Sequence, residues 1–320
     1  MMVMVADEYY IFTGQSFVPQ NVTRVRIDES ISVIPTRAFY CHPNIKELDC
    51  HDKVEKVETQ TFFMCRSLRR IIMPGVKEVE HEAFYDCPAL SDVECDKLEI
   101  IGEGAFARCK SLRSFNLPSV KIVEACAFIR CKALVNVKFG KKLESISDRA
   151  FRNCTSLERI TLPLKDDMIN DNIFQGCVNL KHVDLVEGAI LHKAIAAFQM
   201  MEWRNNMYRE IDAISQILPT TYGGTSFLND MGGKAEAIRT WITNVLRNII
   251  HYKAEHHRYL KEATITLELA LWKKRLTEIN IPEGDEEGRA KCRVKCGADI
   301  VIKNVLPFLE LPPCTYKMKD

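Results

Sequence analysis

Ala105-Phe106-Ala107-Arg108-Cys109-Lys110-Ser111-Leu112 is the stretch that decides the fold, because related stretches recur from residue 39 to about residue 185. The shared frame is Ala-Phe, then Cys three residues after the Phe, then an aliphatic residue three residues later. The Phe positions are 22 or 23 residues apart: Phe39, Phe62, Phe84, Phe106, Phe128, Phe151 and Phe174. One such unit cannot bury its own apolar side, so the repeat predicts stacked coils of a solenoid.

Each repeat also contains a short apolar pattern that is typical of a strand. Apolar residues lie six, nine and eleven positions after each Phe, and the last two follow the period of two that marks a strand with one buried face. Pro74, Pro118 and Pro163 directly follow three of these segments. Proline has no N–H to donate, so it ends the strand there. We expect one strand per coil.

The pattern resembles the BspA-like leucine-rich repeat family, whose mark is Ile-x-x-Ile-x-x-x-Ala-Phe-x-x-Cys-x-x-Leu-x-x-Ile-x-Leu-Pro. Residues 98–118 match it at nearly every position, and the resemblance covers roughly residues 20–187. It implies an α/β fold, a leucine-rich-repeat solenoid with a parallel β-sheet on its concave face. Such repeats generally serve recognition and adhesion, so the resemblance implies function only coarsely. His42 replaces the Cys in the first clear coil, and residues 164–169 lose the apolar spacing, as expected of end coils.

The pattern predicts three parts of the chain. Residues 1–21 are expected to cap the N-terminal end, and residues 22–188 to form about eight coils of 22–23 residues. Residues 189–320 show helical periodicity and form a helical C-terminal region. Within it, residues 189–218 are expected to cover the last coil. Residues 234–279 are expected to form either one long helix or two antiparallel helices that separate near residues 252–257.

The composition is that of an ordinary globular protein, with 47% apolar and 27% charged residues and a formal net charge of +1. Such a small net charge gives no overall field to attract nucleic acid or an anionic membrane. No apolar run approaches the ~20 residues that span a bilayer, and the N-terminus turns acidic too soon for a secretory signal. We therefore expect a cytoplasmic protein without a nucleic-acid or membrane partner.

Six cysteines occupy one repeat position: Cys65, Cys87, Cys109, Cys131, Cys154 and Cys177. Stacked coils would place successive sulfurs one strand spacing apart, about 4.8 Å, which is too far for a disulfide without distortion. A redox or metal ladder is one interpretation. We favour packing, because free Cys is among the most buried residue types and catalysis needs a single nucleophile.

Polar residues between the apolar strand positions should point outward along the concave face. In the first four coils their charges alternate in sign, which predicts pairing between neighbouring strands. The middle coils carry amide and hydroxyl groups with fewer internal partners. The candidate partner-binding residues are Arg70, Asp92, Glu94, Ser114, Asn116, Asn136, Lys138, Arg159, Thr161, His182 and Asp184.

No motif in the chain predicts a catalytic, cofactor-binding or metal-binding residue. Cys292, Cys296 and Cys314 lack the spacing of common zinc sites, and a zinc site made from them with a His is a minor alternative. We predict a non-enzymatic protein–protein interaction module or scaffold that binds another protein. Self-association through the C-terminal helices is a further option. The alternative function is a metal-dependent or enzymatic activity of the helical region, with the repeats as a docking arm.

Overall fold

The computed structural model describes residues 9–14, 17–186, 201–214, 218, 233–279 and 287. The chain divides into two compact units. Met1–Ala189 and Glu210–Thr243 form one, which we call the repeat unit, and Ile190–Arg209 and Asn244–Asp320 form the other, the helical unit. The repeat unit therefore includes the first turns of a helix that begins at Gly233.

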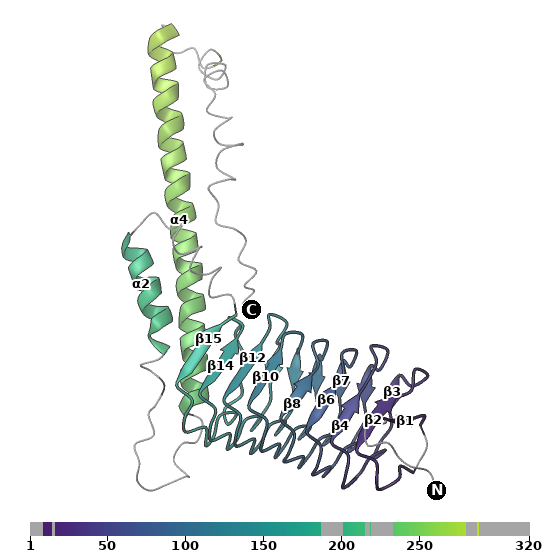
Figure 1. Ribbon diagram of the computed structural model, residues 1–320. Coiled ribbons are helices and arrows are strands. Elements are labelled where there is room, and N and C mark those ends of the chain that lie inside the picture. Colours follow the sequence, from purple (N-terminus) through teal and green to yellow (C-terminus); the bar gives the residue numbers. More distant parts are fainter. Residues whose placement is uncertain are drawn as a thin grey trace, which may run out of the picture. The chain divides into compact units, whose positions relative to one another are not determined.

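Short parallel strands line one side of the repeat unit, one per coil (Figure 1). Five form one sheet, in the order β1 (Tyr10–Phe12), β2 (Arg24–Ile27), β4 (Glu47–Asp49), β6 (Arg70–Ile72) and β8 (Asp92–Glu94). Four form a second sheet, in the order β10 (Ser114–Leu117), β12 (Asn136–Phe139), β14 (Arg159–Leu162) and β15 (His182–Leu185). We call the outward side chains of these two sheets, from β2 to β15, the strand face. The parallel solenoid that the repeat predicted is confirmed.

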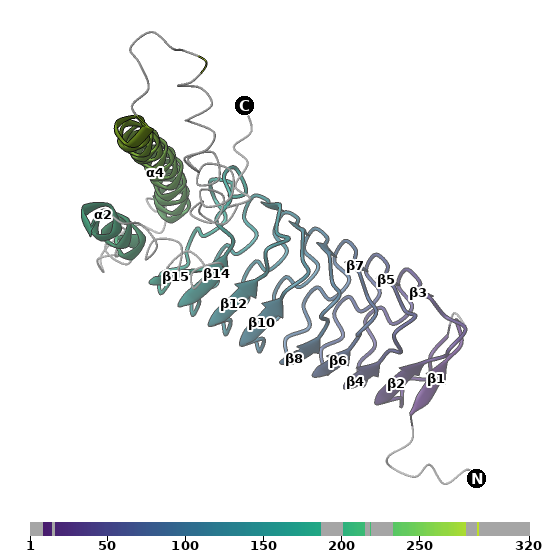
Figure 2. The same ribbon diagram turned by 90° about the horizontal axis from the view of Figure 1, so that it is seen from above.

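A third parallel sheet lies on another side of the coils (Figure 2). Its strands have two residues each: β3 (Val33–Ile34), β5 (Lys56–Val57), β7 (Glu78–Val79), β9 (Ile100–Ile101), β11 (Ile122–Val123) and β13 (Ser145–Ile146). The second residue of every pair is buried, whereas the first is at least partly exposed. These buried residues are the aliphatic residues five positions before each Phe, and their side chains belong to the core.

A column of phenylalanine rings forms the centre of the core. The seven repeat Phe residues are at most 2% exposed. Neighbouring ring centroids lie 4.7–5.9 Å apart, with the rings nearly parallel. Phe12 of β1 adds one more ring, 4.8 Å from Phe39. The predicted packing of each Phe on its counterpart is confirmed, and each buried ring contributes about 1.5–3 kcal/mol of hydrophobic stabilisation.

Most coils turn back through two residues in the left-handed backbone region, two positions before and two after the Phe. In one coil these residues are Gly104, with φ of 63°, and Arg108, with φ of 60°. The N–H groups of Gly104, Phe106 and Arg108 all donate to carbonyl groups of the next coil, at 2.8–3.0 Å. Glycine adopts this conformation without a steric cost, but most coils place other residues there. The hydrogen bonds between coils must offset that strain.

The six recurrent cysteines bond the Phe carbonyl of the preceding coil. Cys109 Sγ, for example, donates to the carbonyl oxygen of Phe84 at 3.3 Å, and the other five repeat the contact at 3.0–3.2 Å. All six side chains are fully buried. Burial raises the pKa of Cys65 to about 12, so its thiol keeps the proton that it donates. The predicted packing role is confirmed, and a hydrogen bond is added to it.

His42 takes the place of the cysteine in the first clear coil and also bonds a backbone carbonyl of the preceding segment. Its Nε2 donates to the carbonyl oxygen of Pro19 at 3.0 Å. Its Nδ1 accepts from the N–H groups of Asn44 and Ile45 at 3.4 and 3.3 Å. Burial lowers the pKa of the ring below its ordinary value, although the bond to Pro19 opposes this shift. Together these contacts select the neutral ring with its proton on Nε2.

The strand ladder is interrupted between β8 and β10. Within residues 91–117, all of which the structure describes, no backbone hydrogen bond joins the two strands. Phe115 of β10 occupies the position where other coils have Leu, Ile or Val. Its ring meets Phe106 and Phe128 edge-on, at 5.2 and 5.6 Å between centroids. The larger side chain needs room between the coils, which gives a physical reason for the break.

The last coil is covered by the first turns of α4 (Gly233–Ile279), within the repeat unit. Ile238, Trp241 and Ile242 are at most 2% exposed. Arg239 pairs with Asp171 at 2.6 Å, in the turn that precedes the last coil's Phe. We expected this cover in residues 189–218. Residues 233–243 contribute to it, and Glu210, Ile214 and Leu218 from the expected range also belong to the repeat unit.

Lys234 supplies the donors that a further coil would have provided. Its Nζ is buried and donates to the carbonyl oxygens of Cys177, Val178 and Leu180 at 2.6, 3.2 and 3.3 Å. One coil earlier, the equivalent carbonyl of Thr155 accepts from the side-chain amide of Asn179 at 2.8 Å. The ammonium group therefore ends the ladder without leaving these carbonyls unsatisfied.

In the helical unit, α2 (Met201–Asp212) contributes Trp203, whose ring lies 5.4 Å from that of Tyr252 and 5.7 Å from that of Tyr259. Asn206 donates to the Tyr252 hydroxyl at 3.2 Å. α4 continues without a break through residues 252–257, so the single-helix alternative is correct and the two-helix alternative is wrong. Among the described helices, none has the length and apolar character needed to cross a membrane.

Replacing Lys234 with Met should lower the free energy of unfolding of the repeat unit by about 1–3 kcal/mol, because the carbonyls at the end of the ladder lose their donor while remaining buried. Urea denaturation followed by circular dichroism measures the change. Lys253→Met, at an exposed position of the same helix, is the matched control and should be neutral. Equal midpoints for both variants would show that Lys234 does not cap the coils.

Acid should destabilise the wild-type protein more than a His42→Cys variant, in which the repeat's usual residue is restored. The pKa of the folded ring is lowered, whereas the unfolded ring titrates near its ordinary value of about 6.5. The stability that the neutral ring contributes is therefore complete above about pH 6.5 and is lost as the pH falls through the folded pKa. Urea midpoints at about pH 7.5 and about pH 5.5 test this, and equal losses in both proteins would contradict it.

Candidate functional site

The first half of the strand face is a network of ion pairs between neighbouring strands. Nitrogen–oxygen distances are 2.8–3.2 Å for Arg24–Glu47, Arg26–Asp49, Arg70–Asp92 and Arg70–Glu94. The pairing that the alternating charges predicted is confirmed. Three candidate residues, Arg70, Asp92 and Glu94, are thus engaged with one another. Exposed ion pairs of this kind each contribute less than about 1 kcal/mol to the stability of the protein. Their main effect is to neutralise the charge of this surface.

The far end of the strand face is also internally paired. Arg159 of β14 binds both carboxylate oxygens of Asp184 on β15, at 2.7 and 2.9 Å. His182 is exposed beside them. Thr161 was expected to meet solvent, but it is only 9% exposed. These four candidate residues therefore offer few free polar groups.

The middle of the strand face is different. Ser114, Asn116, Asn136 and Lys138 make no side-chain hydrogen bond or ion pair with any residue that the structure describes. The four lie in register on two adjacent strands, Ser114 opposite Asn136 and Asn116 opposite Lys138. We call this group the middle quartet. It presents a hydroxyl, two amides and an ammonium group on a backbone that the ladder holds fixed.

Asn136 carries an unsatisfied buried atom. Its Oδ1 is buried and has no hydrogen-bond partner among the described residues, although the residue as a whole is partly exposed. A buried acceptor without a donor costs about 1–3 kcal/mol. Asn136 therefore lowers the stability of the folded protein. This cost makes Asn136 the residue of the middle quartet that points most clearly to a role other than stability.

A second charge ladder runs beside the third sheet, where Glu55 pairs with Lys77 at 2.7 Å and Glu99 with Lys121 at 2.6 Å. We did not predict this ladder from the sequence. The signal was present in the alternation of Glu55, Lys77, Glu99, Lys121 and Glu144 at one repeat position. Because these side chains are paired with one another, we assign them to the stability of the solenoid rather than to binding.

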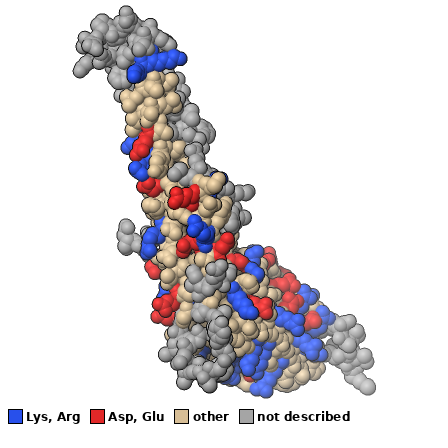
Figure 3. All heavy atoms as spheres, turned by 90° about the vertical axis from the view of Figure 1, so that its left-hand side faces the viewer, with Lys and Arg blue, Asp and Glu red and all other residues tan. Residues whose placement is uncertain are grey.

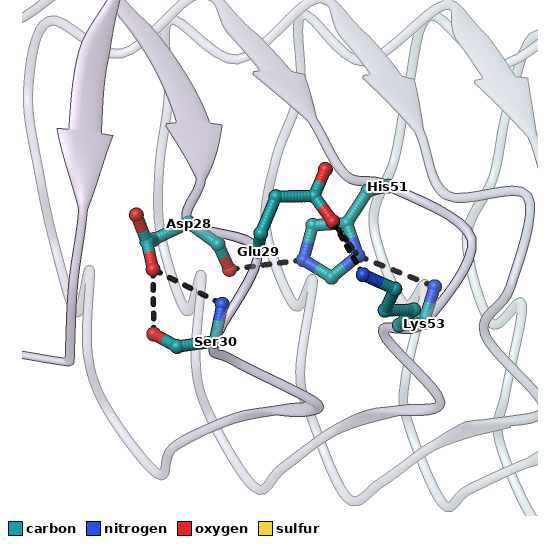
Figure 4. A network of polar contacts seen from close by, with 5 residues as sticks. All are labelled: Asp28, Glu29, Ser30, His51 and Lys53. Atoms are coloured by element: carbon teal, nitrogen blue, oxygen red, sulfur yellow. Dashed lines mark hydrogen bonds and ion pairs between the residues drawn. The ribbon is translucent and has the colours of Figure 1, made fainter.

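The loops that follow β2 and β4 are joined by His51 (Figure 4). Its Nε2 donates to the backbone oxygen of Asp28 at 2.9 Å, and its Nδ1 accepts from the N–H of Lys53 at 3.2 Å. The Lys53 ammonium in turn pairs with Glu29 at 2.9 Å. Every polar group drawn in this network has a partner within it, so the network ties two coils together and leaves little to bind a ligand.

Three aromatic rings stack on the outside of the turns, at the position after the Phe: Tyr40, Phe63 and Tyr85, with centroids 5.0–5.1 Å apart. The Arg37 and Arg108 guanidinium groups lie over the two ends of this stack, each 5.5 Å from a ring centroid. Ala107 follows in the same column, and a hollow of about 340 Å³ opens above it. Arg108 and Arg130 line one part of the hollow and carboxylates line another, so its charge is mixed.

Metal and redox chemistry find no support in the part of the chain that the structure describes. No group of three or more His, Cys, Asp or Glu side chains there is placed to hold a metal ion. On α4, His251, His256 and His257 lie near Glu255 in the sequence, but the Glu255 carboxylate is bound by Arg258 at 2.7 Å. Burial raises the pKa of the thiols of Cys87 and Cys109 well above its ordinary value. Cys292, Cys296 and Cys314 lie outside the described residues.

Replacing Asn136 with Thr should leave the stability of the protein unchanged or raise it by about 1 kcal/mol, because the substitution removes the unsatisfied acceptor and places a β-branched residue on a strand. Thermal and urea unfolding measure the effect. Asn179→Thr is the matched control and should destabilise, because Asn179 donates to the Thr155 carbonyl. Destabilisation by Asn136→Thr equal to that of the control would show that Asn136 is structural.

The repeat region matches a known protein family. The family model for the BspA type leucine rich repeat region matches residues 5–113 and 77–191, with six copies. No curated protein matches the chain. Among solved structures, a leucine-rich repeat protein from Bacteroides ovatus is 26% identical, with a TM-score of 0.44 over 50% of this chain and 42% of that one.

The leucine-rich repeat protein of T. pallidum is 25% identical, with a TM-score of 0.38 over 52% of this chain and 70% of that one. The match with this chain covers less than half of the Bacteroides ovatus protein. No family accounts for the helical unit. The family match extends over more than half of the chain and includes every coil of the solenoid, so the chain belongs to the BspA type leucine-rich repeat family.

Proposed function

We propose that this chain is a non-enzymatic interaction module that binds another protein through the middle of its strand face. Leucine-rich repeat proteins are generally protein-interaction modules, which supports the class of function. The observation that carries the proposal is the contrast along the strand face. Charges on β2 to β8 and at β14–β15 are paired with one another, whereas the middle quartet between them is unpaired.

A surface of this kind suits recognition because it is rigid before the partner arrives. The inward residues of β10 and β12, among them Phe115 and Val137, are at most 2% exposed and fix the strands against the Phe column. Little conformational entropy is then lost on binding, and the Asn116 amide and the Asn136 amide nitrogen can exchange water for polar groups of the partner. The candidate residues Arg159, Thr161, His182 and Asp184 would form the edge of the contact.

We place this activity in the cytoplasm, a reducing compartment. The Sγ–H groups of the repeat cysteines serve as hydrogen-bond donors at every coil, which requires them to stay reduced thiols. No catalytic role is proposed for any residue. Scaffolding or self-association through the helical unit is a separate hypothesis, which light scattering on the full chain would test.

The proposal is tested by affinity capture with quantitative mass spectrometry from a lysate of the cells that make the protein. The variant Asn116→Arg with Asn136→Glu fills the middle quartet with bulky charges and should lose its specific partner by at least about tenfold, equivalent to about 1.4 kcal/mol. Glu144→Arg, an exposed change beside the third sheet, is the control and should capture as the wild type does. An identical set of captured proteins for all three would refute the strand face as the binding surface.

A further inference from the structure

Charge is sharply segregated along the repeats even though the whole chain is nearly neutral. Residues 78–103 contain nine Asp and Glu and a single Lys, whereas residues 104–143 contain nine Lys and Arg and a single Glu. The change of sign falls between two stacked coils, that of Phe84 and that of Phe106. On the repeat part of the face drawn in Figure 3, Lys and Arg lie beside Asp and Glu over much of the surface and prevail toward the lower edge.

The acidic stretch is largely neutralised within the protein. Lys56 lies within ion-pair distance of both Glu78 and Glu80, the nearer oxygen being that of Glu80. The remaining pairs recruit cations from other coils: Arg66–Asp86, Arg70–Asp92, Arg70–Glu94 and Lys121–Glu99. The acidic stretch therefore presents little free charge to a partner.

The basic stretch is not neutralised in the same way. Lys121 and Lys142 act on Glu99, whose pKa they help to lower, and are set aside. None of the seven other cations forms an ion pair with any residue that the structure describes. Lys141 follows β12, and six lie before or within β10 and β12: Arg108, Lys110, Arg113, Arg130, Lys132 and Lys138. We call these six residues the basic band. All but Arg108 are exposed, and Arg108 is partly buried.

The basic band stacks like charges on like. Arg108 and Arg130 hold the same position in adjacent coils, and so do Lys110 and Lys132. These four residues lie in turns, and because adjacent coils are about 4.8 Å apart the like charges repel one another. At another repeat position the sign alternates instead, as it does in Glu55, Lys77 and Glu99. The basic band therefore carries an electrostatic repulsion that no ion pair among the described residues offsets.

The band adjoins the middle quartet. Arg113 directly precedes β10, and Lys138 lies on β12 and belongs to both groups. Arg108 and Lys110 lie in the turn that leads to β10, and Arg130 and Lys132 in the turn that leads to β12. A ligand that runs along the ends of these two strands would meet cations first and side-chain amides next. The Asn116 amide can donate to and accept from a peptide backbone, the amide nitrogen of Asn136 can donate to it, and the cations match carboxylates.

We propose that the basic band and the middle quartet together bind an extended acidic segment of a partner protein, an inference that rests on the proposed function. The carboxylates would neutralise the stacked cations, and the backbone of the segment would pair with Asn116 and Asn136. Nucleic acid fits less well. The outward residues of β2 to β15 include no aromatic side chain on which a base could stack.

The test measures the binding of a fluorescein-labelled peptide of alternating Glu and Gly to the full-length protein by fluorescence anisotropy. A Gln–Gly peptide of the same length is the neutral probe. We expect tighter binding of the Glu–Gly peptide, and weakening as the ionic strength rises from about 0.05 M to about 0.3 M. Lys110→Glu with Lys132→Glu should weaken this binding by at least about tenfold.

Lys46→Glu with Arg69→Glu is the matched control. These two residues are also exposed, also one coil apart and also without an ion pair among the described residues, and the substitutions change the net charge equally. The control should change the affinity by less than about threefold. An equal loss in both variants, or equal binding of the two peptides by the wild type, would overturn the proposal.

Two further arms separate the sources of negative charge. Tighter binding of a single-stranded oligonucleotide, or of vesicles made of phosphatidylserine and phosphatidylcholine, than of the Glu–Gly peptide would also overturn it. Asn116→Arg with Asn136→Glu distinguishes this proposal from the function on which it rests. Loss of the captured partner in that variant, while the wild type ignores the Glu–Gly peptide, would leave the strand face as the binding surface and refute only its acidic ligand.

Discussion

Every coil of this solenoid depends on the next one for partners to its backbone carbonyls and for the second face of its phenylalanine ring. The turn makes this dependence clear. Each recurrent cysteine donates to the Phe carbonyl of the coil before it, and His42 makes the corresponding contact to Pro19 in the first clear coil. At the other end, after the last coil that the structure describes, Lys234 donates to three carbonyls at once. A thiol, an imidazole and an ammonium group thus meet one requirement, the pairing of buried carbonyls.

The sequence was sufficient for the features that repeat. The spacing of Phe39 to Phe174 fixed the coil length, and from it followed the stacked rings, the strands and the opposite charges that meet between coils. Features that occur once were beyond a repeat analysis. Lys234 reaches Cys177 across 57 positions of sequence, and no local pattern marks such a contact. Phe115 looks like an ordinary apolar strand residue, yet its size accompanies the break between β8 and β10.

The candidate surface shows a similar division. The outward direction of Ser114, Asn116 and Lys138 followed from the period of two, because a strand alternates its side chains between faces. The burial of Thr161 and of the Asn136 oxygen did not follow, because burial depends on neighbours far away in the sequence. The left-handed turn residues were equally hidden. Arg, Gln, Glu, Asp, Met and Cys stand where glycine would have signalled the conformation.

The break between β8 and β10 and the change of charge sign lie at the same place, and this bears on how the fold tolerates the basic band. The third sheet continues past the break, since β9 pairs with β7 on one side and with β11 on the other. The Phe column is continuous there as well, with Phe84 and Phe106 at 5.2 Å. Each buried ring contributes about 1.5–3 kcal/mol, which exceeds the roughly 1 kcal/mol or less at stake in an exposed charge pair. The core can therefore hold like charges together, and a partner that supplies carboxylates would convert their repulsion into binding energy.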